Sequence, residues 1–337
     1  MGKKLHRCDQ LNVFGIKLLI LVISFVKIRA PLLSFCVTLT LSGCGSGNES
    51  LTTAITPSSR SSENRNEFEE EMNAVRPFFS PLQSPGPSDW LASFHEPGQS
   101  FAEYIQSDPT VPSDQRRTIY VLPLGNFSQK QNEVIRHACG YLEAFYGLPV
   151  KSLGQLTIKR PLQIKNSRIN PISKREQIRT GYVLDEVLRP LLPDDAAALI
   201  AFTNEDLYPD NSMNYVFGQA SLENRVGVWS LYRLESNEDV HTFLLRTIKI
   251  AAHETGHMFS MHHCTAYNCV MSGSNHLAET DSHPIDACPE CMAKVCWFSG
   301  VTPASRYERL RDFCRKNGLK KEGEEFDAKL AAVRRAG

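Results

Sequence analysis

The chain has 337 residues, which suffices for one large domain with its own hydrophobic core or for two modest ones. Its 37 Lys and Arg residues equal its 37 Asp and Glu residues in number, so no basic surface points to a nucleic acid as partner. The ten cysteines do not suggest a disulfide framework, because four of them cluster late in the chain and the others are scattered.

The first 44 residues are typical of a targeting leader. A basic region with Lys27 and Arg29 precedes a short apolar run, and the small residues of L-S-G stand directly before Cys44. This order is similar to a bacterial lipobox, in which the cysteine is lipidated and becomes the first residue of the mature protein. We therefore expect a lipoprotein signal and a lipid anchor at Cys44, which places the protein in the cell envelope, at the outer membrane.

Two alternatives remain open for this leader. In the first, it is an uncleaved transmembrane anchor. In the second, the gene start is set too early and the protein is cytoplasmic. The apolar run is shorter than the roughly 20 residues that span a bilayer, which favours the lipoprotein.

Residues 45–76 are polar, poor in aromatic residues and rich in Ser, Thr and Asn, which predicts a flexible tether. One domain is expected to follow over residues 77–319, with Trp90 and Phe94 as its first core residues. The charged stretch 320–337 is predicted to be a solvated helix or a frayed end.

Strands and helices alternate along the expected domain, which predicts an α/β fold built in layers. Strands are predicted at 117–124, 196–202, 216–221 and 226–234. Helices are predicted at 128–147, 174–188 and 242–259. The first of these helices has clear ends, because Ser128 and Gln131 form a capping box and Gly147 is a favourable C-cap.

The last predicted helix before residue 260 carries the sequence H-E-x-x-H. His253 and His257 are four residues apart, so on a helix both imidazoles point from one face and can bind one zinc ion. Glu254 is turned about 100° from His253, and from there it can act as general base toward a zinc-bound water without being a ligand.

A third imidazole at His263 extends the motif to H-E-x-x-H-x-x-S-x-x-H, which is similar to the metzincin spacing. Three neutral His ligands leave the fourth tetrahedral position open, as a hydrolase requires. Met271 stands where metzincins place the Met-turn beneath the metal. The usual glycine of this motif is Ser260 here, and a positive φ at that turn costs a residue with a Cβ about 1–2 kcal/mol.

Four cysteines follow the histidines in two close pairs. Cys264 and Cys269 form C-x4-C, and Cys288 and Cys291 form C-x2-C. Two close pairs separated by a loop predict a closed tetrahedral zinc site. Two disulfides are the alternative for these cysteines, and the C-x2-C spacing disfavours it.

Together these motifs resemble the archaemetzincins, metzincin-like peptidases in which a four-cysteine zinc site follows the catalytic histidines. The resemblance covers residues 77–318, includes the segments 88–104 and 207–233, and continues to Lys294, which completes the CxxCxxK pattern of the family. It implies a zincin or metzincin-like catalytic domain with a mixed sheet, an active-site helix and a zinc-knuckle C-terminal part.

The resemblance also implies a zinc-dependent peptidase that acts on a peptide or protein and binds two zinc ions per chain. The catalytic zinc would be held by His253, His257 and His263, with Glu254 as general base. The four cysteines would hold a structural zinc. We expect a monomer without a nucleic-acid partner, in contact with the membrane only through its lipid anchor.

Two further expectations concern the substrate. By analogy with the family, the strand at 226–234 is an edge strand that pairs with an extended peptide, and a plain internal strand is the alternative. A function of another class is a zinc-stabilised peptide-binding protein without turnover. The intact Glu254 disfavours that function, because a scaffold without catalysis does not need the general base.

Overall fold

The computed structural model describes residues 68–337 except 161, 222–223 and 236–238. The leader with Cys44 and most of the expected tether lie outside the described residues, so the predictions for them stay predictions. Among the helices in the described part of the chain, none is long and apolar enough to cross a membrane.

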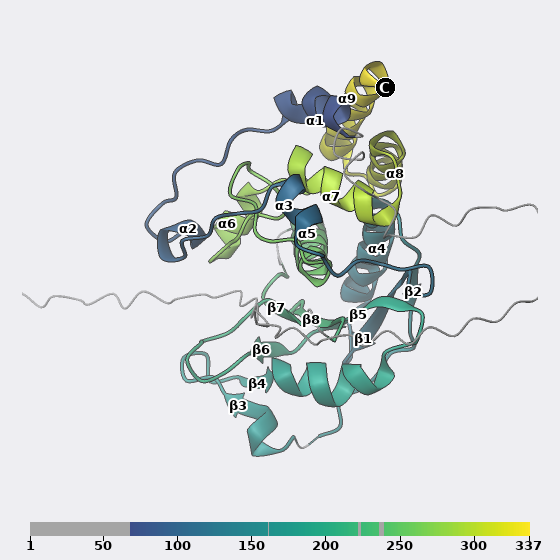
Figure 1. Cartoon of the computed structure of the whole chain (residues 1–337). Helices are drawn as coiled ribbons and strands as arrows, with labels where there is room; N and C mark the ends of the chain where they lie inside the picture. Colours follow the sequence, from purple (N-terminus) through teal and green to yellow (C-terminus); the bar gives the residue numbers. More distant parts are fainter. Residues whose placement is uncertain (1–67, 161, 222–223, 236–238) are drawn as a thin grey trace, which may run out of the picture.

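The elements follow one another along the chain as shown in Figure 1. They are α1 (Glu69–Val75), η3 (Arg76–Phe78), α2 (Trp90–Ser93), α3 (Phe101–Gln106), β1 (Thr118–Leu124), α4 (Gln129–Tyr146), β2 (Val150–Ser152), η4 (Ile164–Asn166), β3 (Ser167–Ile169), β4 (Glu176–Arg179), η5 (Tyr182–Leu188), η6 (Arg189–Leu191), β5 (Ala196–Thr203), β6 (Asp206–Tyr208), β7 (Gly218–Ser221), β8 (Val226–Ser230), α5 (Val240–Met258), α6 (Leu277–Ser282), α7 (Pro289–Ser299), α8 (Pro303–Lys316) and α9 (Lys320–Ala336).

A five-stranded sheet in the order β2-β1-β5-β8-β7 forms the middle of the molecule. Its strands are parallel except β7, which runs antiparallel to β8. The central strand β5 pairs with β8 from Leu199 opposite Val226 to Thr203 opposite Ser230. Every residue of β5 is buried, as expected for a strand that is covered on both faces. The mixed α/β fold class predicted from the sequence is confirmed.

Alternate residues of the strands contribute to two hydrophobic cores, one on each face of the sheet. Ile200 and Phe202 of β5 belong to the larger core, which contains residues of α4 and α5. Leu199 and Ala201 belong to the smaller core, which contains residues of the π-helix η5. Figure 1 shows α4 and α5 above the sheet and the teal helix below it. The larger core extends into α7, α8 and α9, so the predicted metal ligands lie on this side.

Two predicted helices are confirmed together with their ends. The side chain of Ser128 accepts from the backbone of Gln131, the reciprocal capping contact is also present, and Gly147 ends α4 at a φ of 64°. Helix α5 begins at Val240, slightly earlier than predicted, because the carboxylate of Asp239 caps its first turn.

The helix predicted over 174–188 is wrong in its first half. Lys174 lies at a turn with a φ of 58°, and the next residues form β4 instead of a helix. Strand β4 pairs with β3 and β6 in a second sheet of three strands. The helical part begins only at Tyr182, where η5 starts.

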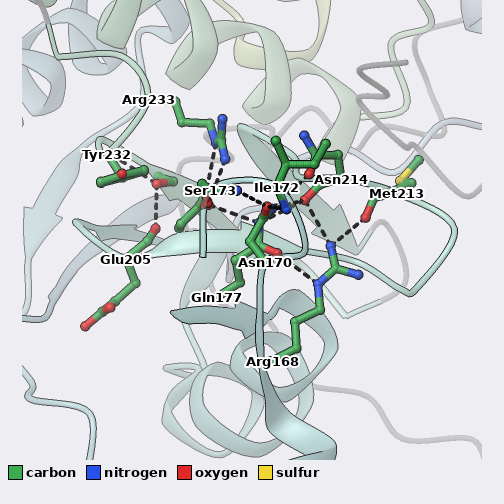
Figure 2. A network of polar contacts seen from close by, with 12 residues as sticks. Arg168, Asn170, Ile172, Ser173, Gln177, Glu205, Met213, Asn214, Tyr232 and Arg233 are labelled. Carbon is green, nitrogen blue, oxygen red and sulfur yellow. Dashed lines mark hydrogen bonds and ion pairs between the residues drawn. The ribbon is translucent and has the colours of Figure 1, made fainter. Parts of the chain in front are cut away.

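A polar network, shown in Figure 2, explains why β4 is a strand. The fully buried Gln177 donates to Asp206 Oδ2 at 3.0 Å and to Asn214 O at 2.9 Å. Arg233 donates to both carboxylate oxygens of Asp206, at 2.7 and 2.8 Å, and Arg168 donates to Asn214 O at 2.9 Å. A helix at β4 would leave these buried groups without partners. The network also fixes the loop that leads into β7.

The expected edge strand is wrong in its position. Strand β8 lies between β5 and β7, so the predicted strand at 226–234 is internal, and its last four residues are not part of the strand. The edge is β7, on whose outer side no strand of the described residues pairs. Helix α5 packs against both β7 and β8, so the edge strand still runs beside the helix with the predicted ligands.

The two ends of the described chain pack together. Helix α1 buries Met72, α9 buries Leu330, and the two helices are in contact (Figure 1). Helix α1 therefore lies within the stretch expected to be a tether, before residue 77. The predicted solvated or frayed helix at 320–337 is wrong as well, because the apolar stripe of α9 finds partners in α1 and α8.

A buried group of three charges joins the last two helices to the segment before α7. Asp286, Arg306 and Lys329 are 2%, 0% and 4% exposed. Asp286 accepts from Arg306 Nη1 at 3.0 Å and from Lys329 Nζ at 2.9 Å. Loss of one partner would leave an uncompensated buried charge, so α8 and α9 belong to the same folded unit as the cysteines.

Candidate metal centres

Helix α5 delivers His253 and His257 from its buried C-terminal turns. Every residue from Thr247 to Met258 is buried. A Cβ added to Gly256 would lie 2.7 Å from the sulfur of Met271, which itself is fully buried. The residue predicted to form the Met-turn therefore packs against the helix between the two histidines, and a glycine is needed there for this close approach.

The three predicted histidine ligands come together. The ring centroids of His253, His257 and His263 lie 4.6 to 5.1 Å apart, and their candidate ligand atoms lie within 4.8 Å of one another. The three residues are 4%, 2% and 6% exposed, so the cluster is shielded from water.

The hydrogen bonds of these histidines fit a cation bound between them. Nδ1 of His253 lies 2.9 Å from Val270 O, and Nδ1 of His257 lies 2.6 Å from Met261 O. Because a carbonyl oxygen only accepts, both Nδ1 atoms carry the hydrogen and both Nε2 atoms are bare. The two Nε2 atoms are 3.0 Å apart, where their lone pairs repel unless a cation lies between them. Two nitrogen ligands of tetrahedral zinc are about 3.3 Å apart, which is close to this distance.

The lowered pKa values of two histidines also fit a cation bound between them. Burial, together with the neighbouring His263, lowers the pKa of His253 to about 3, and burial lowers that of His257 well below its usual value. Nε2 of His263 is buried and has no hydrogen-bond partner among the described residues. Three imidazoles with a ring nitrogen free for a metal are the donor set that zinc prefers at an open site.

Glu254 lies beside the histidines and is fully buried. Both of its carboxylate oxygens are without a hydrogen-bond partner in the described part of the chain. Burial raises the pKa of its carboxyl to about 8. A buried carboxyl without partners is unfavourable for stability, and such groups are found where catalysis requires a proton acceptor.

The turn before His263 has the backbone conformation that the sequence suggested. Ser260 has a φ of 62°, in the left-handed region that favours glycine. Its hydroxyl oxygen accepts from the backbone N–H of Thr110 at 2.9 Å, a contact that glycine cannot make. The strain at Ser260 is therefore partly offset by a hydrogen bond to a distant segment.

The four predicted cysteines form a second, separate cluster. Their Sγ atoms lie within 4.8 Å of one another, and those of Cys264 and Cys288 are 3.6 Å apart. Two thiolate ligands of tetrahedral zinc are about 3.8 Å apart, whereas a disulfide requires about 2.05 Å. The cysteines that the structure describes are all free thiols, so the disulfide alternative is wrong for them.

The surroundings of the cysteines also suit thiolates bound to a metal. Cys269 Sγ accepts from the backbone N–H groups of Met271 and Cys288, at 3.4 and 3.2 Å. The S–H groups of Cys269, Cys288 and Cys291 hold the pKa of Cys264 well below its usual range. Burial by contrast raises the pKa of Cys269 and Cys288. A divalent cation resolves this conflict, because it deprotonates all of its thiol ligands.

Two side chains whose place at the site was not predicted from the sequence, Glu96 and Trp90, contact His263, and a third, Gln99, contacts the loop that carries it. Glu96 Oε2 lies 2.8 Å from Nδ1 of His263, and the Trp90 ring lies 4.9 Å from the imidazole of the same residue. Gln99 Oε1 accepts from the backbone N–H of His262 at 3.2 Å. The sequence marked this region only through its family resemblance, since a single Glu 167 residues before His263 gives no pattern of its own.

The remaining histidines near these centres have structural roles. Nδ1 of His276 accepts from the backbone N–H of Glu279 at 3.1 Å and so caps α6. Its Nε2 therefore carries the hydrogen and faces Asp89 Oδ1 at 3.3 Å. Although Asp89, His276 and Glu279 lie close enough to share a metal, these bonds leave no bare ring nitrogen for one. His283 lies with Nδ1 2.7 Å from Asn268 Oδ1.

The chain is similar to known proteins over much of its length. The profile of peptidase family M54 matches residues 156–296. The chain is 34% identical over 268 residues to archaemetzincin-2 from Homo sapiens, which covers 69% of this chain and 73% of that protein. It is 31% identical over 189 residues to archaemetzincin from Thermococcus kodakarensis, which covers 53% of this chain and 95% of that protein. The crystal structure of archaemetzincin from Methanopyrus kandleri is similar over 55% of this chain and 96% of that one, with 26% identity and a TM-score of 0.44.

Proposed function

Because this chain belongs to the archaemetzincin family and is a zinc metallopeptidase, we propose that His253, His257 and His263 hold its catalytic zinc and that Glu254 is the general base of peptide hydrolysis. The observation that carries this proposal is the buried cluster of three histidines beside a carboxyl group that has no hydrogen-bond partner among the described residues. When bound, zinc supplies a Lewis acid that polarises the scissile carbonyl and lowers the pKa of the attacking water to about 7.

Glu254 supplies the proton transfer that this chemistry needs. Its carboxylate accepts the proton of the attacking water and later passes it to the leaving amine. A pKa raised by burial suits this role, because an acceptor near neutral pH also returns the proton readily. The hydrogen bonds at Nδ1 meanwhile fix the tautomer of each histidine, so that every Nε2 stays available to the metal.

The test replaces Glu254 with Gln in the full chain and measures turnover on a peptide library together with zinc content. We expect turnover to fall about 10²–10⁴-fold while zinc content stays unchanged. The matched control is Glu324→Gln, which alters a glutamate on α9 whose side chain is 69% exposed. Glu254→Gln as active as the wild type would contradict the mechanism. Peptide binding without turnover in the wild type would instead favour the non-catalytic alternative.

We also propose that Cys264, Cys269, Cys288 and Cys291 hold a second, structural zinc, which gives two zinc ions per chain. Four thiols complete a tetrahedral set, so this site has no open position for a water or a substrate. The support is the Sγ cluster and the N–H groups directed at Cys269. Metal analysis of the purified protein tests the stoichiometry.

The substrate that we propose is a peptide or protein in extended form. Strand β7 is an open edge in the described part of the molecule and packs beside α5. An extended peptide can add to such an edge through main-chain hydrogen bonds. This assigns to β7 the role that the sequence had suggested for β8.

For location we propose a lipid anchor at Cys44, with a monomeric protein in the cell envelope and no nucleic-acid partner. The support is the L-S-G-C sequence after a basic and apolar run, in residues outside the described range. Lipid labelling of the wild type but not of Cys44→Ala is the expected result. A mature protein that still begins at Met1 would contradict the anchor.

A further inference from the structure

His263 differs from the other two histidines, because it is the one that α5 does not carry. It follows the left-handed turn at Ser260, beyond the end of the helix. We propose that Glu96 is a positioning residue that orients His263 for metal binding. This inference rests on the proposed function of His263 as a zinc ligand.

The contact between the two residues is direct and partly buried. Glu96 Oε2 lies 2.8 Å from Nδ1 of His263, and the side chains are 30% and 5% exposed. Because the carboxylate accepts, Nδ1 donates the hydrogen, and the neutral imidazole that binds a metal then has a bare Nε2, as in the other two histidines. Nε2 of His263 has no hydrogen-bond partner among the described residues, so it is available as a ligand.

The acceptor is charged in this case alone. His253 and His257 donate to backbone carbonyls, whereas His263 donates to a carboxylate. A charged acceptor forms a stronger hydrogen bond and makes the imidazole a better donor to a metal. The ligand that lacks the support of the helix therefore has the strongest acceptor.

The ring of His263 is also held from the side. Trp90 packs against it edge to face, with the ring centroids 4.9 Å apart. Trp90 is itself fixed, because its backbone N–H donates to the carboxylate of Glu279 at 2.9 Å. A Cβ on Gly273 would lie 2.4 Å from the indole of Trp90, so the loop after Met271 packs directly against this ring.

The chain on the C-terminal side of Glu96 is anchored to the loop that carries His263. Gln99 Oε1 accepts from His262 N at 3.2 Å and from Lys294 Nζ at 3.1 Å, and Gln99 Nε2 donates to Ser260 O at 3.4 Å. Glu96 is therefore held on both sides by contacts to the loop and helices around the metal centre. Its position lies outside residues 156–296, which the family profile matches.

The experiment measures the zinc affinity of the histidine centre by competition with a chelator. The variants are Glu96→Ala, which removes the acceptor, and Glu96→Gln, which keeps an oxygen acceptor but removes the charge. We expect Glu96→Ala to bind this zinc about 10–100-fold more weakly, with Glu96→Gln in between. The matched control is Glu103→Gln, which removes the same charge nearby and keeps the capping box of α3.

Cobalt substitution separates the two centres, because thiolate ligands give charge-transfer bands that nitrogen ligands lack. The bands of the cysteine centre and the melting temperature should stay unchanged in both Glu96 variants. Zinc affinity of Glu96→Ala equal to that of the wild type would overturn the inference. So would an equal loss in Glu103→Gln, which would indicate a general effect of charge.

The experiment gives a different result if the proposed function itself is wrong. His263→Ala should abolish zinc binding at the histidine centre. If the wild type and His263→Ala bound the same amount of zinc with the same affinity, His263 would not be a ligand, and both the proposed function and the role of Glu96 would be contradicted. If only His263→Ala lost zinc and Glu96→Ala did not, the inference alone would be wrong.

Discussion

The two candidate metal centres are neighbours in the sequence but are built in opposite ways. The cysteine centre is self-contained, since its four thiols and the N–H groups directed at Cys269 all lie between residues 264 and 291. The histidine centre depends on Glu96 from far upstream and contains Glu254, a buried carboxylate without partners in the described chain.

This difference separates a structural site from a reactive one. On the proposed assignment the protein fills every ligand position of the cysteine centre, so metal binding there would stabilise the fold and leave no position for a substrate. On the proposed assignment the histidine centre keeps one position open, and Glu254 has no partner among the described residues, which lowers stability and favours reactivity. Three predictions test how strictly the two centres divide these roles.

The largest effect is expected from Cys288→Ala. Structural zinc sites contribute about 10–16 kcal/mol of binding free energy, which equals or exceeds the stability of an ordinary domain. The variant should therefore bind at most one zinc ion and lose most of its cooperative thermal unfolding. Cys296→Ala is the matched control, because this buried thiol lies on the same helix α7 but outside the cluster. A Cys288→Ala variant with two zinc ions and an unchanged melting temperature would contradict the structural role.

A smaller effect on stability is expected at low pH, from the titration of His283 in the loop between the cysteine pairs. Burial lowers the pKa of His283 to about 4, against a usual value of 6.5. The unfolded chain thus binds this proton below pH 6.5 while the folded chain does not, so stability falls as the pH falls from 6.5 toward 4. Between pH 7 and pH 5 this loss is about 2 kcal/mol. Urea unfolding of the wild type and His283→Gln measures it, and equal pH dependence in both would refute the assignment.

The smallest effect is expected at the turn between the two centres. Ser260→Ala keeps the strain of a φ of 62° and loses the acceptor for Thr110, whereas Ser260→Gly relieves the strain and loses the same acceptor. Glycine should therefore be more stable than alanine by about 1–2 kcal/mol, with turnover of the glycine variant near that of the wild type. Chemical unfolding of the pair measures this difference. Two variants of equal stability would show that the turn is not strained.

The clustering of these histidines and cysteines could be predicted from the sequence because their spacing is local. His253 and His257 are fixed by the helical period, and the two cysteine pairs by loop closure, so the pattern is visible without tertiary structure. The residues that hold these side chains in place could not be predicted from the sequence. Glu96 and Gln99 reach the centre through contacts that span more than 160 residues, and no local pattern records such a contact.

The dependence on long-range contacts also explains which predictions about the fold were wrong. Strand β4 was hidden by a helical pattern, because its stability comes from the distant partners Asp206 and Asn214 of Gln177. The edge position of β7 depends on the order of strands, which the alternation of residues in β8 does not contain. Helix α9 carries an apolar stripe, but its partner α1 lies at the other end of the described chain. In each case a long-range contact overrode the local preference.

The contact between Glu96 and His263 also sets an order of events during protein synthesis. Ribosomes add about 5–20 residues per second, so the 167 residues between these partners take roughly 8–33 s to appear. Asp286 likewise precedes its hydrogen-bond partner Lys329 by 43 residues. The segment around Glu96 therefore stays without its final partner until His263 has been added, whereas the four cysteines of the other centre are added close together.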